Sequence, residues 1–124
     1  MIEYNKLEKW TFGIDTDKLT NLVFDGRKTA TSSLYKFDNL PIVGDISVLT
    51  DLNNNSVCVV KTKEVIVTEF KRITWDLVKL EGEDKSLEEW RRVHIDYFNK
   101  IDSSFNENTK VKFEIFEVTE IFKW

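Results

Sequence analysis

The chain has 124 residues, of which 41% are hydrophobic and 32% charged, and its formal net charge is -4 at pH 7. This composition predicts a single folded domain over residues 1–124 and excludes a disordered or membrane-spanning chain. The negative charge also excludes broad, non-specific binding to phosphate backbones, although a local basic pocket for a nucleotide or a short RNA stays open.

The small number of cysteines and histidines limits which disulfides and metal sites the chain can form. Cys58, the single cysteine, lies in an apolar run, so we expect a buried thiol and no intramolecular disulfide. The charged start of the chain, residues 1–6, lacks the apolar run of a signal peptide, which favours the cytoplasm. With one cysteine, one histidine and no glycine-rich phosphate loop, we expect neither a metal nor a cofactor.

The first predicted element is a short helix from about Asp17 to Phe24, with an apolar stripe at Leu19, Leu22 and Val23. Asp15 or Thr16 is placed to cap its N-terminus. Gly26 stands where a left-handed residue would end the helix, and Lys28 follows at the exit.

Strands dominate the next part of the sequence. Segments rich in β-formers or with alternating apolar residues predict strands at residues 29–35, 46–49, 57–62, 65–68 and 111–118. Pro41 and Gly44 mark a turn, and residues 51–55 are typical of a hairpin loop.

Two helical pieces separate the last two strands. Thr74 can cap a short helix that reaches Leu80, and Ser86 begins a longer one, to Asn99, with Glu89 completing a capping box. Helical spacing predicts one buried face on the longer helix, at Leu87, Trp90, His94, Tyr97, Phe98 and Ile101. Short strands interrupted by helices indicate a mixed α+β domain.

Lys28 and the acidic segment after the short helix are the first candidates for a site. A lysine at a helix exit is ordinarily solvated and interacts with the helix dipole, whereas a lysine in a pocket can clamp an anion or act as a base. Glu83 and Asp84 are most simply explained as a solvated loop. Glu81, next to the apolar helix, is the better candidate to face inward and pair with Lys28.

Four motifs together resemble the ASCH domain family. They are Gly26-x-Lys28-x-x-Thr31, Glu81-Gly82-Glu83, Trp10-x-Phe12-Gly13 and Ser86-Leu87-x-x-Trp90-Arg91-x-x-His94. The resemblance spans nearly the whole chain and implies an α+β fold, a PUA-like mixed β pseudo-barrel with two or three flanking helices. The acidic segment is one residue shorter than the family's usual Glu-Gly-Glu-Gly-Asp stretch.

The resemblance also implies site residues. Members of the family reported as small amidohydrolases use a Lys, a Thr three residues later and a distant Glu, which fall here on Lys28, Thr31 and Glu81. Because residues three apart on a strand point to opposite faces, Lys28 must still be in the loop when Thr31 is in the strand. We expect the three to line one concavity, with Trp10 or Tyr35 on its wall.

The implied ligand is a nucleobase, a modified nucleoside or an RNA segment. We predict ligand contacts, by stacking, hydrogen bonding or charge, from Trp10, Phe12, Thr29, Tyr35, Glu83, Trp90, Arg91 and His94. Three functions stay open: an amidohydrolase acting on acylated nucleosides such as N4-acetylcytidine, a metal-independent ribonuclease, and a non-catalytic RNA-binding module. The protein is expected to be a monomer or a homodimer, with no membrane partner.

Overall fold

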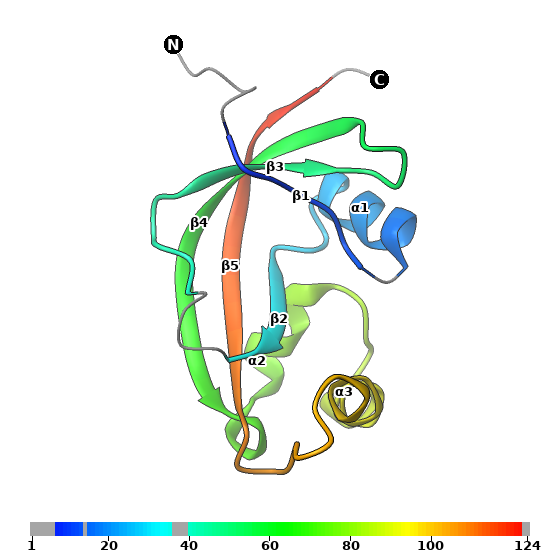
Figure 1. The fold of residues 1–124 in the computed structure, drawn as a ribbon, viewed down its shortest axis with the longest axis vertical. Coiled ribbons are helices and arrows are strands. Elements are labelled where there is room, and N and C mark those ends of the chain that lie inside the picture. The colour runs from blue at the N-terminus through cyan, green and yellow to red at the C-terminus, as the bar shows by residue number, and fades with distance from the viewer. Residues whose placement is uncertain (1–6, 14, 36–39, 123–124) are drawn as a thin grey trace.

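A computed structural model describes residues 7–13, 15–35 and 40–122. Its strands and helices, in chain order, are β1 Lys9–Trp10, α1 Thr16–Phe24, β2 Ala30–Leu34, β3 Ile46–Thr50, β4 Ser56–Glu69, the 3₁₀ turn η2 Phe70–Arg72, α2 Trp75–Val78, the 3₁₀ turn η3 Lys79–Glu81, α3 Leu87–Ile101 and β5 Lys110–Ile121 (Figure 1).

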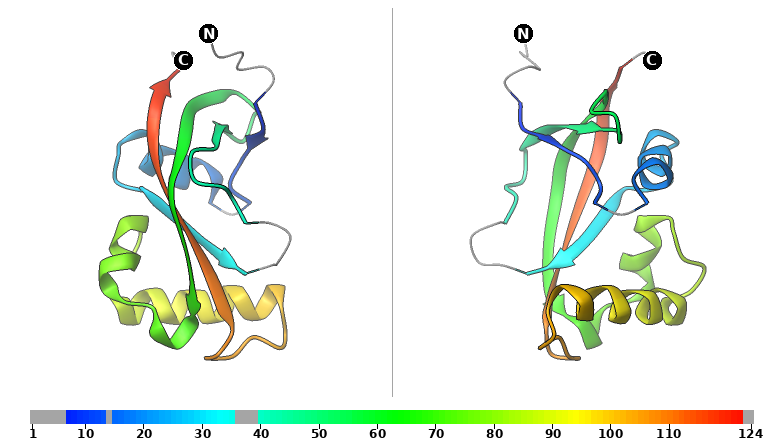
Figure 2. Two further views of the ribbon diagram at one scale, coloured as in Figure 1. Left: turned by 90° about the vertical axis from the view of Figure 1, so that its left-hand side faces the viewer. Right: turned by 45° about the vertical axis from the view of Figure 1, so that its right-hand side comes forward.

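The described strands form one mixed sheet in the order β1-β3-β4-β5-β2. β1 runs parallel to β3, and the other pairs are antiparallel. Figure 2 shows β4 and β5 as two long, twisted strands that run along the length of the molecule. The predicted α+β class with flanking helices is confirmed, but β1 and β2 are open edges, so the sheet does not close into a barrel.

The hydrophobic residues gather in two clusters at opposite ends of the sheet. One cluster joins α1, through Leu19 and Val23, to β3, β4 and β5. The other joins α2 and α3, through Val78, Trp90 and Phe98, to the far ends of β4 and β5. α1 and α3 therefore lie towards opposite ends of β2, and β2 runs between them (Figure 1).

The C-terminus of α1 and the N-terminus of α3 follow the sequence signals, whereas Thr74, at the N-cap of α2, makes no capping hydrogen bond with its side chain. Gly26 adopts a left-handed φ of 79°, and the amides of Gly26 and Arg27 donate to the carbonyls of Val23 and Leu22, which is a Schellman end. Ser86 caps α3 by accepting from the Glu89 amide at 3.1 Å. The Glu89 carboxylate reaches back to the Lys85 amide, one residue earlier than in a standard capping box.

Some details of the sequence prediction were wrong. β1 and η2 were not predicted, and residues 57–68 belong to one strand, β4, with register irregularities at Val59/Val60 and Thr62/Glu64. Ile101, which was placed on the buried face of α3, is 52% exposed. Asp15 occupies the cap position of α1, but its side chain makes no capping hydrogen bond.

Candidate active site

Lys28 is held by backbone hydrogen bonds to two separate elements. Its own amide donates to the Leu22 carbonyl at the end of α1, at 3.0 Å, and the Thr29 amide donates to the Leu80 carbonyl in η3, at 2.8 Å. β2 begins only at Ala30, so Lys28 is still in the loop when Thr31 is in the strand. This is the arrangement that the spacing of Lys28 and Thr31 requires.

The acidic segment approaches the Lys28 backbone through Gly82. Gly82 has a left-handed φ of 70°, and a Cβ at this position would collide with the Arg27 carbonyl oxygen. Only glycine tolerates both the conformation and the close approach. The turn therefore places the carboxylates on either side of it, Glu81 and Glu83, next to the lysine.

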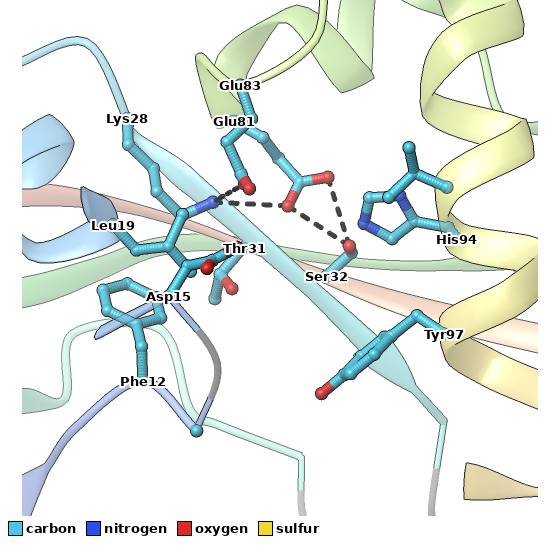
Figure 3. Close-up of a pocket in the computed structure, with 12 residues that line it drawn as sticks. Phe12, Asp15, Leu19, Lys28, Thr31, Ser32, Glu81, Glu83, His94 and Tyr97 are labelled. Atoms are coloured by element: carbon cyan, nitrogen blue, oxygen red, sulfur yellow. Dashed lines mark hydrogen bonds and ion pairs between the residues drawn. The ribbon is translucent and has the colours of Figure 1, made fainter. Parts of the chain in front are cut away.

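Lys28 forms ion pairs with both carboxylates in the protein interior. Its Nζ lies 3.3 Å from Glu81 Oε1 and 2.7 Å from Glu83 Oε2 (Figure 3). The side chains of Lys28 and Glu81 are only 1% and 3% exposed, and that of Glu83 is 22% exposed. The expectation that Glu83 lies in a solvated loop was wrong, because the glycine turn folds it inward over Lys28.

Glu81 is the centre of a wider hydrogen-bond network. Ser32 Oγ lies 3.2 and 3.1 Å from its two carboxylate oxygens, and Trp90 Nε1 donates to Oε2 at 2.6 Å. The lysine ammonium and the indole N–H can only donate. Together with the Ser32 hydroxyl they give Glu81 three hydrogen-bond partners, so this carboxylate joins the Lys28 loop, β2 and α3.

A pocket of about 170 Å³ opens beside this network. Its lining, drawn in Figure 3, comes from the loops before and after α1, from α1, β2, the acidic segment and α3. The lining residues are Phe12, Gly13, Asp15, Leu19, Lys28, Thr31, Ser32, Glu81, Glu83, Val93, His94 and Tyr97. The charged groups among these are one ammonium against three carboxylates. Lys28 Nζ also lies 5.8 Å from the Phe12 ring centroid, within the range of a cation–π contact.

Thr31 lies at the border between this pocket and a second one. Neighbouring strand residues point to opposite faces, so Thr31 and Ser32 diverge, and Thr31 is paired with Glu114 of β5. The second pocket, of about 580 Å³, is lined by Thr31 together with Trp10, Lys112 and Glu114, among others. Lys28, Thr31 and Glu81 thus share the first concavity, but no hydrogen bond joins the Thr31 hydroxyl to Lys28 Nζ.

His94 reaches the pocket from α3 (Figure 3). Its ring stacks on Trp90, with ring centroids 4.1 Å apart, and its Nδ1 lies 2.9 Å from the Trp90 carbonyl oxygen. Nearby, burial raises the pKa of the Asp84 carboxyl, while the charge of His94 acts in the opposite direction.

Several residues that were predicted to contact the ligand do not line this pocket. Trp90 is 0% exposed and donates to Glu81, so its ring offers no stacking surface. The Arg91 guanidinium donates to the Lys71 and Ile73 carbonyls and lies over the Phe70 ring, away from the pocket. The Thr29 hydroxyl donates to the Leu80 carbonyl.

The two aromatic residues expected on the pocket wall are also not there. Trp10 lines the second pocket, and Tyr35 lines neither pocket. Phe12 and Tyr97 supply aromatic walls to the first pocket instead.

Ser32, Asp15 and Tyr97 belong to this pocket but were missed as site residues. Ser32 had no distinguishing local signal within a strand rich in hydroxyls. Tyr97 did have one, since it is three residues from His94 on the same helix and therefore shares its face.

Comparison with known proteins agrees with the motifs. Residues 8–120 match the family described as ASCH domain. The chain belongs to the ASCH domain family. A structure of an ASCH domain from Lactobacillus crispatus JV V101 is 25% identical, has a TM-score of 0.84, and covers 94% of this chain and 82% of its own.

Two further structures extend the likeness of the fold. A protein from Enterococcus faecalis V583 is 23% identical with a TM-score of 0.83, covering 100% of this chain and 85% of that one. An ASCH protein from Zymomonas mobilis is 11% identical with a TM-score of 0.58, covering 92% and 70%. No curated protein matches the chain.

The described residues contain neither a membrane-spanning helix nor a cluster of metal-binding side chains. No helix in this part of the protein has the length and apolar character needed to cross a membrane. Likewise, the described His, Cys, Asp and Glu side chains form no group of three or more that could hold a metal ion.

Proposed function

We propose that this ASCH domain binds a nucleoside in the Lys28 pocket and hydrolyses an acyl amide on its base. The observation that carries the proposal is the buried Lys28–Glu81–Glu83 cluster beside a pocket that is also lined by Thr31. Pockets for drug-sized ligands measure about 300–1,000 Å³. At about 170 Å³, this one fits a base-sized fragment better than a whole nucleotide.

The lining suits the edge and faces of a nucleobase. Carboxylate and hydroxyl oxygens, at Glu83 and Ser32, can accept from ring and exocyclic N–H groups. The Phe12 and Tyr97 rings supply apolar surface on the walls. Aromatic walls with a few polar groups are how proteins recognise unstacked bases.

The charge of the pocket favours a neutral nucleoside over a phosphate-bearing ligand. Three carboxylates, at Asp15, Glu81 and Glu83, stand against the single ammonium of Lys28, and the whole chain carries a net charge of -4. Phosphate contacts require uncompensated cations. A ribonuclease reaction, with its phosphate at this position, is therefore the less well supported catalytic alternative.

For amide hydrolysis, the Thr31 hydroxyl attacks the acyl carbon and Lys28 accepts its proton, with Glu81 orienting Lys28. Lys28 begins as an ammonium held by two carboxylates. It must therefore first pass a proton to Glu83, whose carboxylate lies 2.7 Å away. Neutral Lys28 then takes the Thr31 proton as the hydroxyl adds to the acyl group.

A non-catalytic binding module is the second candidate function. It is favoured by one observation: the Lys28 ammonium is directed to Glu81 and Glu83 and shares no hydrogen bond with Thr31. In that case the pocket binds a nucleoside, or an exposed base of an RNA, without hydrolysing it.

The test is chromatographic. Purified protein is incubated with N4-acetylcytidine and, separately, with mixed RNA, and release of cytidine or of RNA fragments is followed. Thr31→Ala should abolish cytidine release, whereas Ser33→Ala, a matched change on the same strand outside this pocket, should not. Binding of both substrates without turnover of either would establish the binding module instead.

Lys28→Arg separates the two roles of the lysine. Arginine keeps the positive charge but stays protonated at working pH. If Lys28 accepts the Thr31 proton, this variant should be inactive while still binding the product cytidine. An active Lys28→Arg variant would show that Lys28 only provides charge, and the proton-abstraction role would have to be abandoned.

A further inference from the structure

His94 is the one imidazole in the pocket lining, and its hydrogen bond fixes how it is protonated. Nδ1 lies 2.9 Å from the Trp90 carbonyl oxygen, which can only accept a hydrogen bond. Nδ1 therefore carries a hydrogen in the neutral as well as in the charged ring. Stacking on Trp90, with centroids 4.1 Å apart, holds the plane of the ring.

This arrangement leaves Nε2 as the atom that gains or loses a proton. No hydrogen bond from Nε2 to another described residue is present, and the His94 side chain lines the pocket (Figure 3). A histidine whose one nitrogen is fixed by a carbonyl and whose other nitrogen faces a ligand pocket is arranged for proton transfer.

The two glutamates of the pocket are already engaged with Lys28, so the proton for the leaving amine needs another donor. Glu81 accepts from Lys28 at one carboxylate oxygen and from Trp90 at the other, and Ser32 contacts both oxygens, so its carboxyl is already engaged with buried partners. Glu83 takes a proton from Lys28 in the proposed hydrolysis, but its carboxyl lies 2.7 Å from Lys28 Nζ, and that proton returns to Lys28 once Lys28 has reprotonated Thr31. The charged or titratable groups that surround His94 in and beside the pocket are Asp15, Lys28, Glu81, Glu83, Asp84 and Tyr97.

We propose that His94 is the catalytic acid of the pocket, donating the Nε2 proton to the nitrogen of the leaving amine. This inference rests on the proposed amide hydrolysis and adds to it a residue that the Lys-Thr-Glu resemblance does not contain. It also assigns a chemical role to a histidine that the helical spacing alone placed on the buried face of α3.

The proton balance closes over two half-reactions. In the first, the Thr31 oxygen bonds to the acyl carbon and gives its proton to neutral Lys28, the C–N bond breaks, and the nitrogen leaves with the proton from Nε2. In the second, a water oxygen bonds to the acyl carbon and gives its proton to Nε2, while the Thr31 oxygen leaves and recovers a proton from Lys28. The products are the free amine and a carboxylic acid. His94 ends protonated as it began, and the proton held by Glu83 returns to Lys28.

The first measurement uses wild-type protein. Because His94 is the only histidine, its imidazole gives a single set of long-range ¹H–¹⁵N NMR correlations. At a pH where the ring is neutral, we expect the hydrogen on Nδ1. A neutral ring with its hydrogen on Nε2 would overturn the inference, and this result does not depend on any variant folding.

The second measurement compares His94→Gln with wild type in turnover of N4-acetylcytidine across pH. Gln keeps a polar group near the Nε2 position but does not titrate. Arg92→Gln, an exposed change on the same helix, is the matched control. The wild-type rate should fall with rising pH at the midpoint found for His94 by NMR. His94→Gln should lose this limb and be about 10²-fold slower or more, with cytidine affinity within about 3-fold.

The outcomes separate the two claims. If His94→Gln keeps the wild-type rate and the same pH limb, the role of His94 is overturned while the proposed hydrolysis stands. If wild-type protein turns over no acylated nucleoside, the proposed hydrolysis fails and takes the role of His94 with it.

Discussion

Lys28→Met removes the only cation from a buried cluster and should destabilise the fold strongly. Removing one partner of a buried ion pair leaves an uncompensated charge, at a cost of about 3–5 kcal/mol. Glu83 is 22% exposed and can turn to water, and Glu81 keeps the donors Ser32 and Trp90. We therefore expect a loss near the lower limit, about 3 kcal/mol.

The assay is urea and thermal unfolding followed by tryptophan fluorescence. For a domain of 124 residues, about 3 kcal/mol corresponds to a fall of about 12 °C in Tm. Arg27→Met is the control, because the Arg27 side chain is 70% exposed and pairs only at the surface with Asp25. It should change the free energy of unfolding by at most about 0.5 kcal/mol.

A double variant tests the cause of the effect. Lys28→Met with Glu81→Gln removes the orphaned charge but keeps an acceptor for Trp90, so it should recover part of the stability that Lys28→Met loses. If Lys28→Met is no less stable than Arg27→Met, the lysine is solvated and the buried cluster described above is wrong.

Three further predictions concern stability and titration. Phe98→Ala should cost about 3–5 kcal/mol in urea unfolding, since the ring is fully buried against Phe70 and Phe105, and an unchanged midpoint would contradict this packing. Burial raises the pKa of the Cys58 thiol to about 11, so a thiol reagent at pH 8 should modify unfolded but not native protein, and rapid native modification would refute the burial. Burial also raises the pKa of the Asp84 carboxyl above its ordinary 3.8, so its ionised form disfavours the folded state. Asp84→Asn should therefore raise Tm at pH 7 but not below pH 3.8, and an unchanged Tm at pH 7 would contradict the raised pKa.

Local signals predicted the helices well. Ser86 and the apolar spacing of Trp90 and Phe98 located α3, and Gly26 located the end of α1, because caps and helical faces depend on residues a few positions apart. β1 was not predicted, because a strand of two residues is defined by its pairing with β3 rather than by its own sequence.

The site was harder to predict because it depends on long-range contacts. The position of Glu81 beside the apolar helix and the resemblance to the family both predicted its pairing with Lys28. Their burial follows from the contact between the α1 exit and η3, which local sequence does not encode. Glu83 turns inward because Gly82 has a positive φ, and a single glycine between two glutamates does not reveal that conformation. Trp90 was predicted both as a buried residue and as a ligand contact. The helical spacing located its burial correctly, and a fully buried ring cannot contact a ligand.

An NMR titration tests most directly whether the pocket beside Lys28 and Glu81 receives a nucleoside. Backbone amide shifts of ¹⁵N-labelled protein are followed while N4-acetylcytidine is added, with cytidine monophosphate as the phosphate-bearing comparison. We predict saturable shifts concentrated at Ser32, Gly82, Glu83 and His94. The monophosphate should bind more weakly, because three carboxylates line the pocket. Shifts confined to the far side of the sheet, around Lys112 and Glu114, or no saturable shift at all, would contradict this prediction.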